Sequence, residues 1–142
     1  MNSKRTAIAF WVFFLISCEL DQKESTESYW IGRETAFTHD FEYLNGSSDQ
    51  PSLLVRRNSK DLFSGSVERN QSGVLTEQVY KEGKLNGKSI KKSPDGSWVE
   101  ANYLSGRLHG QMKLYDRSGL LRSVMNYSNG VLTQSQPSLS SD

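Results

Sequence analysis

Cysteine is almost missing from this sequence of 142 residues, and its scarcity excludes several kinds of fold and site. Cys18 is the only cysteine, so no disulfide can form within the chain and no zinc site can be built from several thiolates. Histidine is represented only by His39 and His109, and proline by three residues. The sequence therefore offers few residues that could serve as the nucleophile or base of a cysteine- or histidine-dependent enzyme.

A long apolar run is also missing, so the sequence predicts no membrane-spanning helix. A helix needs about 20 apolar residues to cross a bilayer, whereas the longest apolar run here is the ten-residue AIAFWVFFLI at positions 7–16. Lys4 and Arg5 precede this run, and small residues follow it. A cationic start, a short apolar centre and a small-residue end are typical of a secretory signal peptide, which we predict for residues 1–17.

The end of that segment, Leu15-Ile16-Ser17-Cys18, resembles a bacterial lipobox. In a lipobox the cysteine thiol accepts a diacylglycerol, a small residue marks the cleavage site and branched apolar residues lie in the membrane. The resemblance covers residues 1–18 and implies a lipoprotein held through Cys18 at a bacterial cell membrane or outer membrane, facing away from the cytoplasm. The alternative is that Cys18 only ends an ordinary signal peptide or a short anchor helix.

Charge of one sign does not dominate the whole chain, which has 17 basic and 16 acidic residues, but its two parts differ. Positions 18–49 carry eight acidic and two basic side chains, while positions 50–142 carry thirteen basic and eight acidic. The first stretch is rich in Glu and Ser without apolar periodicity, which predicts a solvated tether. We assign 18–52 to this tether and a poorly defined lead-in segment, in which the aromatic residues of 29–44 predict a strand or a short helix.

From position 53 onward the sequence repeats itself with a period of 23 residues. The phrase YKEGKLNGK is followed by YLSGRLHGQ and then by the fainter YSNGVLTQ. The positions that recur at spacings of 23 or 24 residues are Gly73, Gly96 and Gly119; Leu62, Leu85 and Leu108; Gly83, Gly106 and Gly130; and Tyr80, Tyr103 and Tyr127. A fixed period of this length indicates an array in which each unit is one supersecondary element.

Each unit is predicted to be a β-hairpin. Short runs rich in β-branched and aromatic side chains alternate with turns such as QSG, SPDG and DRSG. Glycine supplies the positive φ that such turns require, which we expect of Gly96 and Gly119. The predicted fold class is therefore all-β, an array of antiparallel hairpins over 53–134 followed by a disordered tail at 135–142. One additional residue before Tyr127 predicts a β-bulge.

The phrase Y-x-x-G-x-L-x-G resembles the bacterial variant of the MORN repeat, in which tyrosine and glycine punctuate antiparallel hairpins. The residues that fit it are Tyr80, Gly83, Leu85 and Gly87; Tyr103, Gly106, Leu108 and Gly110; and Tyr127, Gly130 and Leu132. Gln134 stands where the last glycine belongs, and Phe63 and Gly65 occupy the Leu and Gly positions of a lead-in turn. The resemblance covers about residues 53–132. It implies no catalytic residue, and it allows either a scaffold or an antitoxin of the YwqK type.

Two rows of side chains are predicted to run across the hairpins. They consist of Tyr80, Tyr103 and Tyr127, and of Leu75, Trp98 and Leu121. Aromatic side chains at one repeat position either stack on a ligand or close each hairpin against the next. The structural role is favoured, because a repeat without a thick core needs contacts between units.

Few residues are arranged for catalysis. His109 occupies the repeat position of Ser64 and Asn86, which predicts a polar turn residue. Glu77 and Glu100 share one repeat position and could lie as neighbours, but a glycosidase pair also needs a cleft. No phosphate loop, zinc pattern or calcium loop occurs, so we predict a protein without enzyme activity, metal or cofactor.

The basic residues of the repeats are the main functional lead. Lys88, Lys91, Lys92 and Lys113 are predicted to form a binding face for a protein or an anionic envelope partner, with protection of the sheet against aggregation as the alternative role. Export from the cytoplasm argues against a nucleic-acid partner. The predicted function is a non-catalytic, membrane-anchored binding or scaffold module of the cell envelope, and the alternative is an antitoxin or immunity protein that neutralises a toxin.

Overall fold

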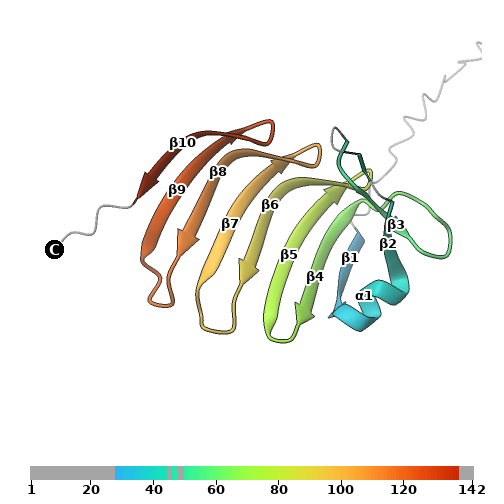
Figure 1. Cartoon of the computed structure of the whole chain (residues 1–142). Helices are drawn as coiled ribbons and strands as arrows, with labels where there is room; N and C mark the ends of the chain where they lie inside the picture. Colours follow the sequence, from blue (N-terminus) through green and yellow to red (C-terminus); the bar gives the residue numbers. More distant parts are fainter. Residues whose placement is uncertain (1–27, 45, 48–49, 138–142) are drawn as a thin grey trace, which may run out of the picture.

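The computed structural model describes residues 28–44, 46–47 and 50–137, which form an all-β fold around one large sheet (Figure 1). In spatial order its strands are β1 (Ser28–Arg33), β4 (Gly65–Gln71), β5 (Val74–Lys81), β6 (Lys84–Lys92), β7 (Trp98–Leu104), β8 (Arg107–Tyr115), β9 (Leu121–Ser128) and β10 (Val131–Pro137). From β4 to β10 every neighbouring pair is antiparallel and consecutive in the chain, which confirms the predicted array of hairpins. The predicted signal peptide and Cys18 lie outside the described residues.

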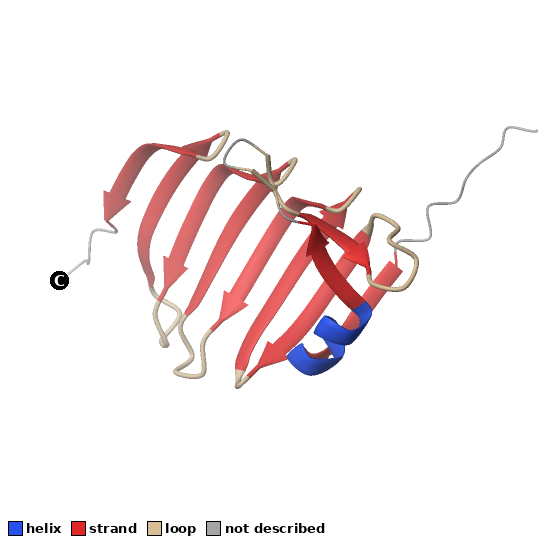
Figure 2. Ribbon diagram, turned by 45° about the vertical axis from the view of Figure 1, so that its right-hand side comes forward, coloured by secondary structure: helices blue, strands red, loops and turns tan. Residues whose placement is uncertain are grey.

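A small unit lies against the sheet at the β1 end (Figure 2). It consists of α1 (Glu34–Asp40), β2 (Phe41–Leu44) and β3 (Leu53–Arg56), with β2 and β3 paired antiparallel. β1 joins the large sheet parallel to β4, and the small unit forms the connection between them. The segment 29–44 therefore contains both of the predicted alternatives, a strand and a short helix.

Two predicted boundaries differ from the observed ones. The sheet begins at Ser28, inside the range 18–52 assigned to the tether and lead-in segment, because β1 pairs with β4. The sheet ends at Pro137, inside the range 135–142 assigned to a tail, because β10 continues its ladder with β9. Pairing with a neighbouring strand thus orders residues that carry no repeat pattern of their own.

The two-residue turns at one end of the hairpins set the repeat. Glu82 and Gly83 adopt φ angles of 50° and 76°, and two positive φ angles in succession are typical of a type I′ turn. The turns at 105–106 and 129–130 have the same signs of φ. This turn type matches the right-handed twist of the strands. The two strands that it joins can therefore pair directly, and the same pairing recurs in each unit.

The turns at the other end of the hairpins also use glycine. Gly96 and Gly119 adopt φ angles of 89° and 86°, which confirms their predicted positive φ. In the second of these turns the Asp116 carboxylate accepts hydrogen bonds from the Ser118 hydroxyl at 2.6 Å and from the Leu120 backbone N–H at 3.0 Å. These hydrogen bonds hold the pKa of Asp116 below its usual range and fix the turn in one geometry.

One recurring backbone hydrogen bond joins successive hairpins. The donor N–H and acceptor carbonyl pairs are Gly83 and Phe63 (2.8 Å), Gly106 and Leu85 (2.7 Å), and Gly130 and Leu108 (2.8 Å). Phe63 therefore holds the repeat position of Leu85 and Leu108. Leu62, which the 23-residue spacing grouped with those leucines, is 49% exposed, whereas Phe63 is 2% exposed. The spacing of the first unit is thus one residue shorter than the period suggested.

The residue after each of these acceptors completes the turn of the next hairpin. The accepting side chain and donating backbone N–H are Ser64 and Glu82 (2.8 Å), Asn86 and Ser105 (3.2 Å), and His109 and Asn129 (3.5 Å). A hydroxyl, an amide oxygen and an imidazole nitrogen thus serve the same purpose. His109, predicted as a polar turn residue, lies inside β8, and its ring contacts the turn of the next hairpin.

The tyrosine row lies on one face of the sheet. The cross-strand partners are Gly65 and Leu85 for Tyr80, Gly87 and Leu108 for Tyr103, and Gly110 and Leu132 for Tyr127. A glycine partner leaves room for the ring, because it has no side chain of its own. Tyr80 is 3% exposed and its hydroxyl lies 2.8 Å from that of Tyr43, and burial raises its pKa above the usual value. These contacts support the structural reading of the row.

The predicted bulge before Tyr127 is present in β9. The register with β8 moves by one residue between Leu114 and Tyr115, so that Arg122 has no partner across the strands. The Arg122 guanidinium instead contacts the Asp116 carboxylate, with Nε at 2.7 Å. The additional residue is therefore absorbed beside the turn, and the tyrosine keeps its direction.

The hydrophobic core lies between the small unit and the strands β1, β4 and β5. Its residues are Phe37, Phe41, Leu54, Phe63, Val67 and Tyr80. Aromatic rings dominate it: the Phe41 ring centre lies 5.0 Å from that of Phe63 and 5.7 Å from that of Trp30, both edge to face. No comparable unit covers β6–β10 among the described residues, so most side chains there are partly exposed. The compact end of the described fold is therefore the end that carries β1 and the small unit.

Candidate functional site

The two faces of the large sheet have different surroundings. The face that carries Val67 and Tyr80 packs against the small unit and is here called the covered face. The opposite face, called the open face, has no element against it in the described part of the chain. Successive side chains of a strand point to opposite faces, so the strand register assigns residues to each face. Central open-face residues are Tyr29, Ile31, Ser66, Glu68, Glu77, Val79, Lys88, Ile90, Lys92, Trp98, Glu100, Lys113, Tyr115 and Val124.

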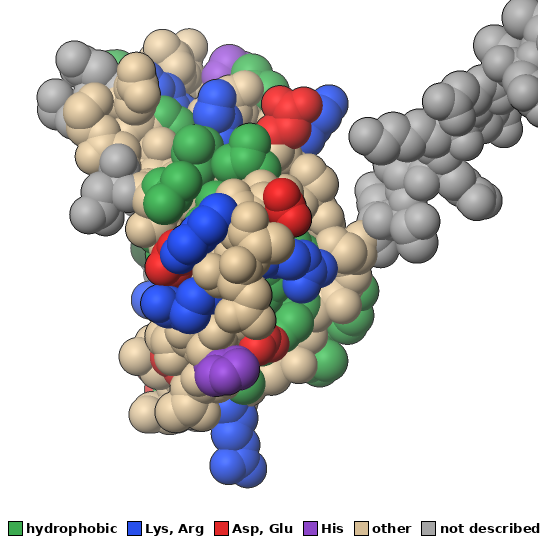
Figure 3. All heavy atoms as spheres, turned by 90° about the vertical axis from the view of Figure 1, so that its right-hand side faces the viewer, with side chains coloured by type: hydrophobic (Ala, Val, Ile, Leu, Met, Phe, Trp, Pro, Cys, Tyr) green, Lys and Arg blue, Asp and Glu red, His purple; other side chains and the backbone are tan. Residues whose placement is uncertain are grey.

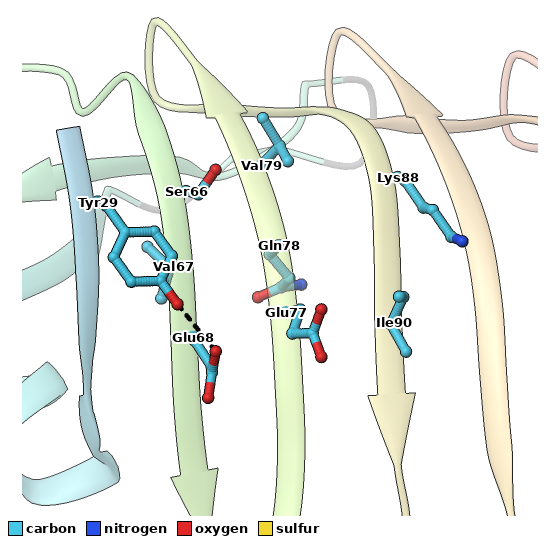
Figure 4. Close-up of a pocket in the computed structure, with 9 residues that line it drawn as sticks. All are labelled: Tyr29, Ser66, Val67, Glu68, Glu77, Gln78, Val79, Lys88 and Ile90. Carbon is cyan, nitrogen blue, oxygen red and sulfur yellow. Dashed lines mark hydrogen bonds between the residues drawn. The ribbon is translucent and has the colours of Figure 1, made fainter. Parts of the chain in front are cut away.

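A groove crosses the open face over β1, β4, β5 and β6 (Figure 4). Its volume is about 230 Å³, and its apolar lining includes Tyr29, Val79 and Ile90. The Tyr29 side chain is 63% exposed, and its hydroxyl donates a hydrogen bond to Glu68 Oε2 at 2.9 Å. This hydrogen bond raises the pKa of Tyr29. The groove therefore combines exposed apolar surface with a carboxylate whose orientation is fixed.

The charges along the open face are largely paired. Lys92 Nζ lies 3.0 Å from Glu77 Oε1, and Lys88 Nζ lies 3.1 Å from Glu100 Oε2. Each pair connects neighbouring strands and is partly exposed, so it contributes about 0–1 kcal/mol to stability. Its larger effect is to cancel the positive charge that a basic face would need.

The four lysines predicted as one binding face are divided between the two faces. Lys88, Lys92 and Lys113 belong to the open face, whereas Lys91 lies opposite Thr76 and Val99 on the other face. Adjacent residues of a strand point in opposite directions, so Lys91 and Lys92 could not share a face. At the α1 and β1 end of the molecule, a surface separate from the two faces of the sheet, basic and acidic side chains lie among one another (Figure 3). The predicted single basic face is therefore not formed.

The two glutamates considered for acid–base chemistry do not form a pair. In the register, Ile90 lies between Glu77 and Glu100, and each carboxylate is bound to its own lysine. Glu77 lies instead opposite Glu68 of β4. Glycoside hydrolysis requires two carboxylates that face each other across the bound sugar, and these two carboxylates are instead held by lysines on different strand pairs.

An aromatic pair extends the open face beyond the groove. Trp98 of β7 and Tyr115 of β8 stack with ring centres 4.6 Å apart and an interplanar angle of 10°. The predicted row of Leu75, Trp98 and Leu121 exists, with Lys92 and Tyr115 intervening in register.

Sequence reasoning missed two aromatic contributors to the open face. Tyr115 was missed because it ends a strand rather than holding a repeat position, although the hairpin register about the intervening turn places it opposite Trp98. Tyr29 was missed because the parallel pairing of β1 with β4 carries no local sequence signal.

Comparisons with known proteins add no function. No protein-family model matches the chain, and a search of curated proteins gives no match. Among the described residues no three His, Cys, Asp or Glu side chains gather as a metal site would require. No helix in the same residues is long and apolar enough to cross a membrane.

Proposed function

We propose that this protein is a non-catalytic, lipid-anchored binding module of the bacterial cell envelope, and that the open face contacts a protein partner. The groove beside Tyr29 carries the proposal, because it is the place where exposed apolar side chains, an aromatic ring and fixed polar groups converge. The lipobox-like sequence that ends at Cys18 supports the anchor.

The position of the groove suits a membrane-proximal role. It lies beside β1, whose first residue, Ser28, follows Cys18 by ten positions. At full extension ten residues span about 33–36 Å. A lipid on Cys18 would therefore hold the sheet within one domain diameter of the membrane, where it would meet other envelope proteins.

The pairing of charges on the open face favours a protein partner over an anionic polymer. Lys88 and Lys92 are already bound to carboxylates, so the net attraction for polyanions is small. Tyr29, Ile90 and the stacked Trp98 offer the aromatic and aliphatic contacts that dominate the centres of protein interfaces. The resemblance to MORN-variant repeats, which include scaffolds, is consistent with this role.

The lipid anchor is tested by replacing the acceptor thiol. Cys18→Ser should abolish labelling by a fatty-acid analogue in a bacterial host and release the protein from the membrane fraction, because a hydroxyl is a far poorer acceptor in this modification. Ser17→Ala, which keeps a small residue at the cleavage position, is the control and should be labelled normally. Continued labelling of the serine variant would rule out Cys18 as the lipid site.

The open face is tested by shortening the exposed apolar side chains of the groove. The variant Tyr29→Ala with Val79→Ala should reduce the partner recovered on affinity purification from envelope extracts by at least about tenfold, since truncation at interface centres of this kind costs about 1–2 kcal/mol per residue. Both side chains are exposed, at 63% and 37%, so folding should be preserved.

The matched control for this experiment truncates an exposed side chain elsewhere. Leu104→Ala removes a residue that is 52% exposed and outside the groove, and it should leave recovery unchanged. Quantitative mass spectrometry of the three preparations gives the comparison. Equal recovery of the partner with the groove variant and with the control would mean that the partner binds outside the groove. This outcome would not bear on the lipid anchor, which the Cys18→Ser variant tests separately.

A further inference from the structure

The last strand of the sheet has an open edge. β10 pairs with β9 on one side and has no strand on its other side in the described part of the chain. Its side chains are exposed, with Val131 at 67% and Leu132 at 49%. An edge of this kind presents unpaired backbone N–H and C=O groups that are ready to join another strand.

β10 also lacks the usual protection of an edge. Of the ten strands in the described residues, it is the only one that contains no Lys, Arg, Asp or Glu. β1, at the opposite edge, contains Arg33. Charged side chains keep edge strands from pairing with other molecules, so their absence from this strand alone favours pairing there.

We propose that β10 pairs edge to edge with β10 of a second copy of this chain, antiparallel and about a two-fold axis. In such an arrangement the same short strand lies on both sides of the axis, so a charge near the middle of β10 would lie close to the same charge of the second copy. A strand free of charge is what this geometry needs. The proposal does not depend on the lipid anchor or on the open face.

The uncharged polar side chains of β10 suit a second copy. Gln134 and Gln136 lie opposite Asn126 and Val124 of β9 and so share the open face. With the two-fold axis at Ser135, Gln134 of one copy faces Gln136 of the second copy. By symmetry, Gln136 of the first copy faces Gln134 of the second. A primary amide both donates and accepts hydrogen bonds, so glutamine opposite glutamine is self-complementary.

The ends of β10 limit this contact to a short stretch. The register shifts between Leu132 and Gln134, which bends the strand, and Pro137 offers no N–H. The two-fold arrangement also uses both copies of the edge, so it closes at two molecules instead of extending into a fibre. We therefore expect a dimer of modest affinity.

Native mass spectrometry of the full chain, released from detergent micelles, tests the proposal. The native chain should give a dimer at micromolar concentration. Gln134→Lys with Gln136→Lys should lower the dimer affinity at least tenfold, because lysine then faces lysine across the axis, and Gln134→Glu with Gln136→Glu should do the same. Mixing these two variants should restore a mixed dimer, since opposite charges then face each other.

The control places the same charge away from the edge. Gln71→Lys with Gln111→Lys alters two exposed glutamines of β4 and β8, neither of which pairs with β10, and should leave the dimer intact. Recovery of the mixed dimer distinguishes repulsion at β10 from misfolding of the variants. A monomeric native chain, an unaffected lysine variant, or two charged variants that fail to combine would each overturn the proposal.

Discussion

Replacing Phe41 by alanine is expected to destabilise the fold by about 3–5 kcal/mol, the usual cost of removing a buried phenylalanine ring. Phe41 is 1% exposed and its ring centre lies 5.0 Å from that of Phe63 and 5.1 Å from that of Phe37. Its loss would leave a cavity at the junction of the small unit and the sheet. Small domains are stable by about 5–15 kcal/mol, so this one change removes a large share of the stability.

Urea unfolding followed by tryptophan fluorescence measures this effect, because Trp30 contacts the Phe41 ring edge to face. The control is Leu104→Ala, which shortens a side chain that is 52% exposed and should change the unfolding free energy by less than about 0.5 kcal/mol. Similar midpoints for both variants would show that the aromatic cluster is not the core of the fold.

Gly65→Ala is expected to destabilise the protein by about 1–3 kcal/mol more than Gly87→Ala, although both glycines hold the same repeat position. Both have positive φ, 142° and 105°, so both variants suffer backbone strain. A Cβ on Gly65 would lie 1.9 Å from the carbonyl oxygen of Ser28, whereas a Cβ on Gly87 meets nothing closer than 3.9 Å, at Val79. The difference in unfolding free energy between the two variants therefore measures the effect of the close approach of β1 to β4.

Hydrogen exchange locates this effect in the structure. In Gly65→Ala the backbone N–H groups of β1 should lose protection while those of β7–β9 keep it, because only the parallel strand must move. In Gly87→Ala the β1 groups should exchange as in the native chain. Uniform loss of protection in both variants would mean that strain in the array, and not the contact with Ser28, determines the cost.

The repeat array could be predicted from the sequence because its signals are local. Three signals predict the array: the glycines of the turns, the 23-residue period and the alternation within each strand. Each of them can be recognised within one or two consecutive hairpins. Even the extra residue before Tyr127 followed from comparing one unit with the next. The resemblance to MORN-variant repeats stays a prediction, and so do the lipid on Cys18 and the absence of enzyme activity.

The rest depended on contacts between distant parts of the chain. β1 is short, and nothing in SYWIGR specifies a parallel partner that begins at Gly65. The small unit of α1, β2 and β3 contains no sequence repeat, so its helix and strands could not be assigned from periodicity. The division of Lys91 from Lys92 could have been foreseen, because it follows from the two-residue period of a strand.

The connection between β1 and β4 has a consequence for the order of folding. The hairpins from β4 to β10 close through neighbouring segments, so each can form early at a small cost in chain entropy. β1 must wait for the helix and the β2–β3 pair to be placed before it reaches its parallel partner. Refolding experiments should therefore see the array gain protection first, and β1 should be the last strand to dock and the first to detach.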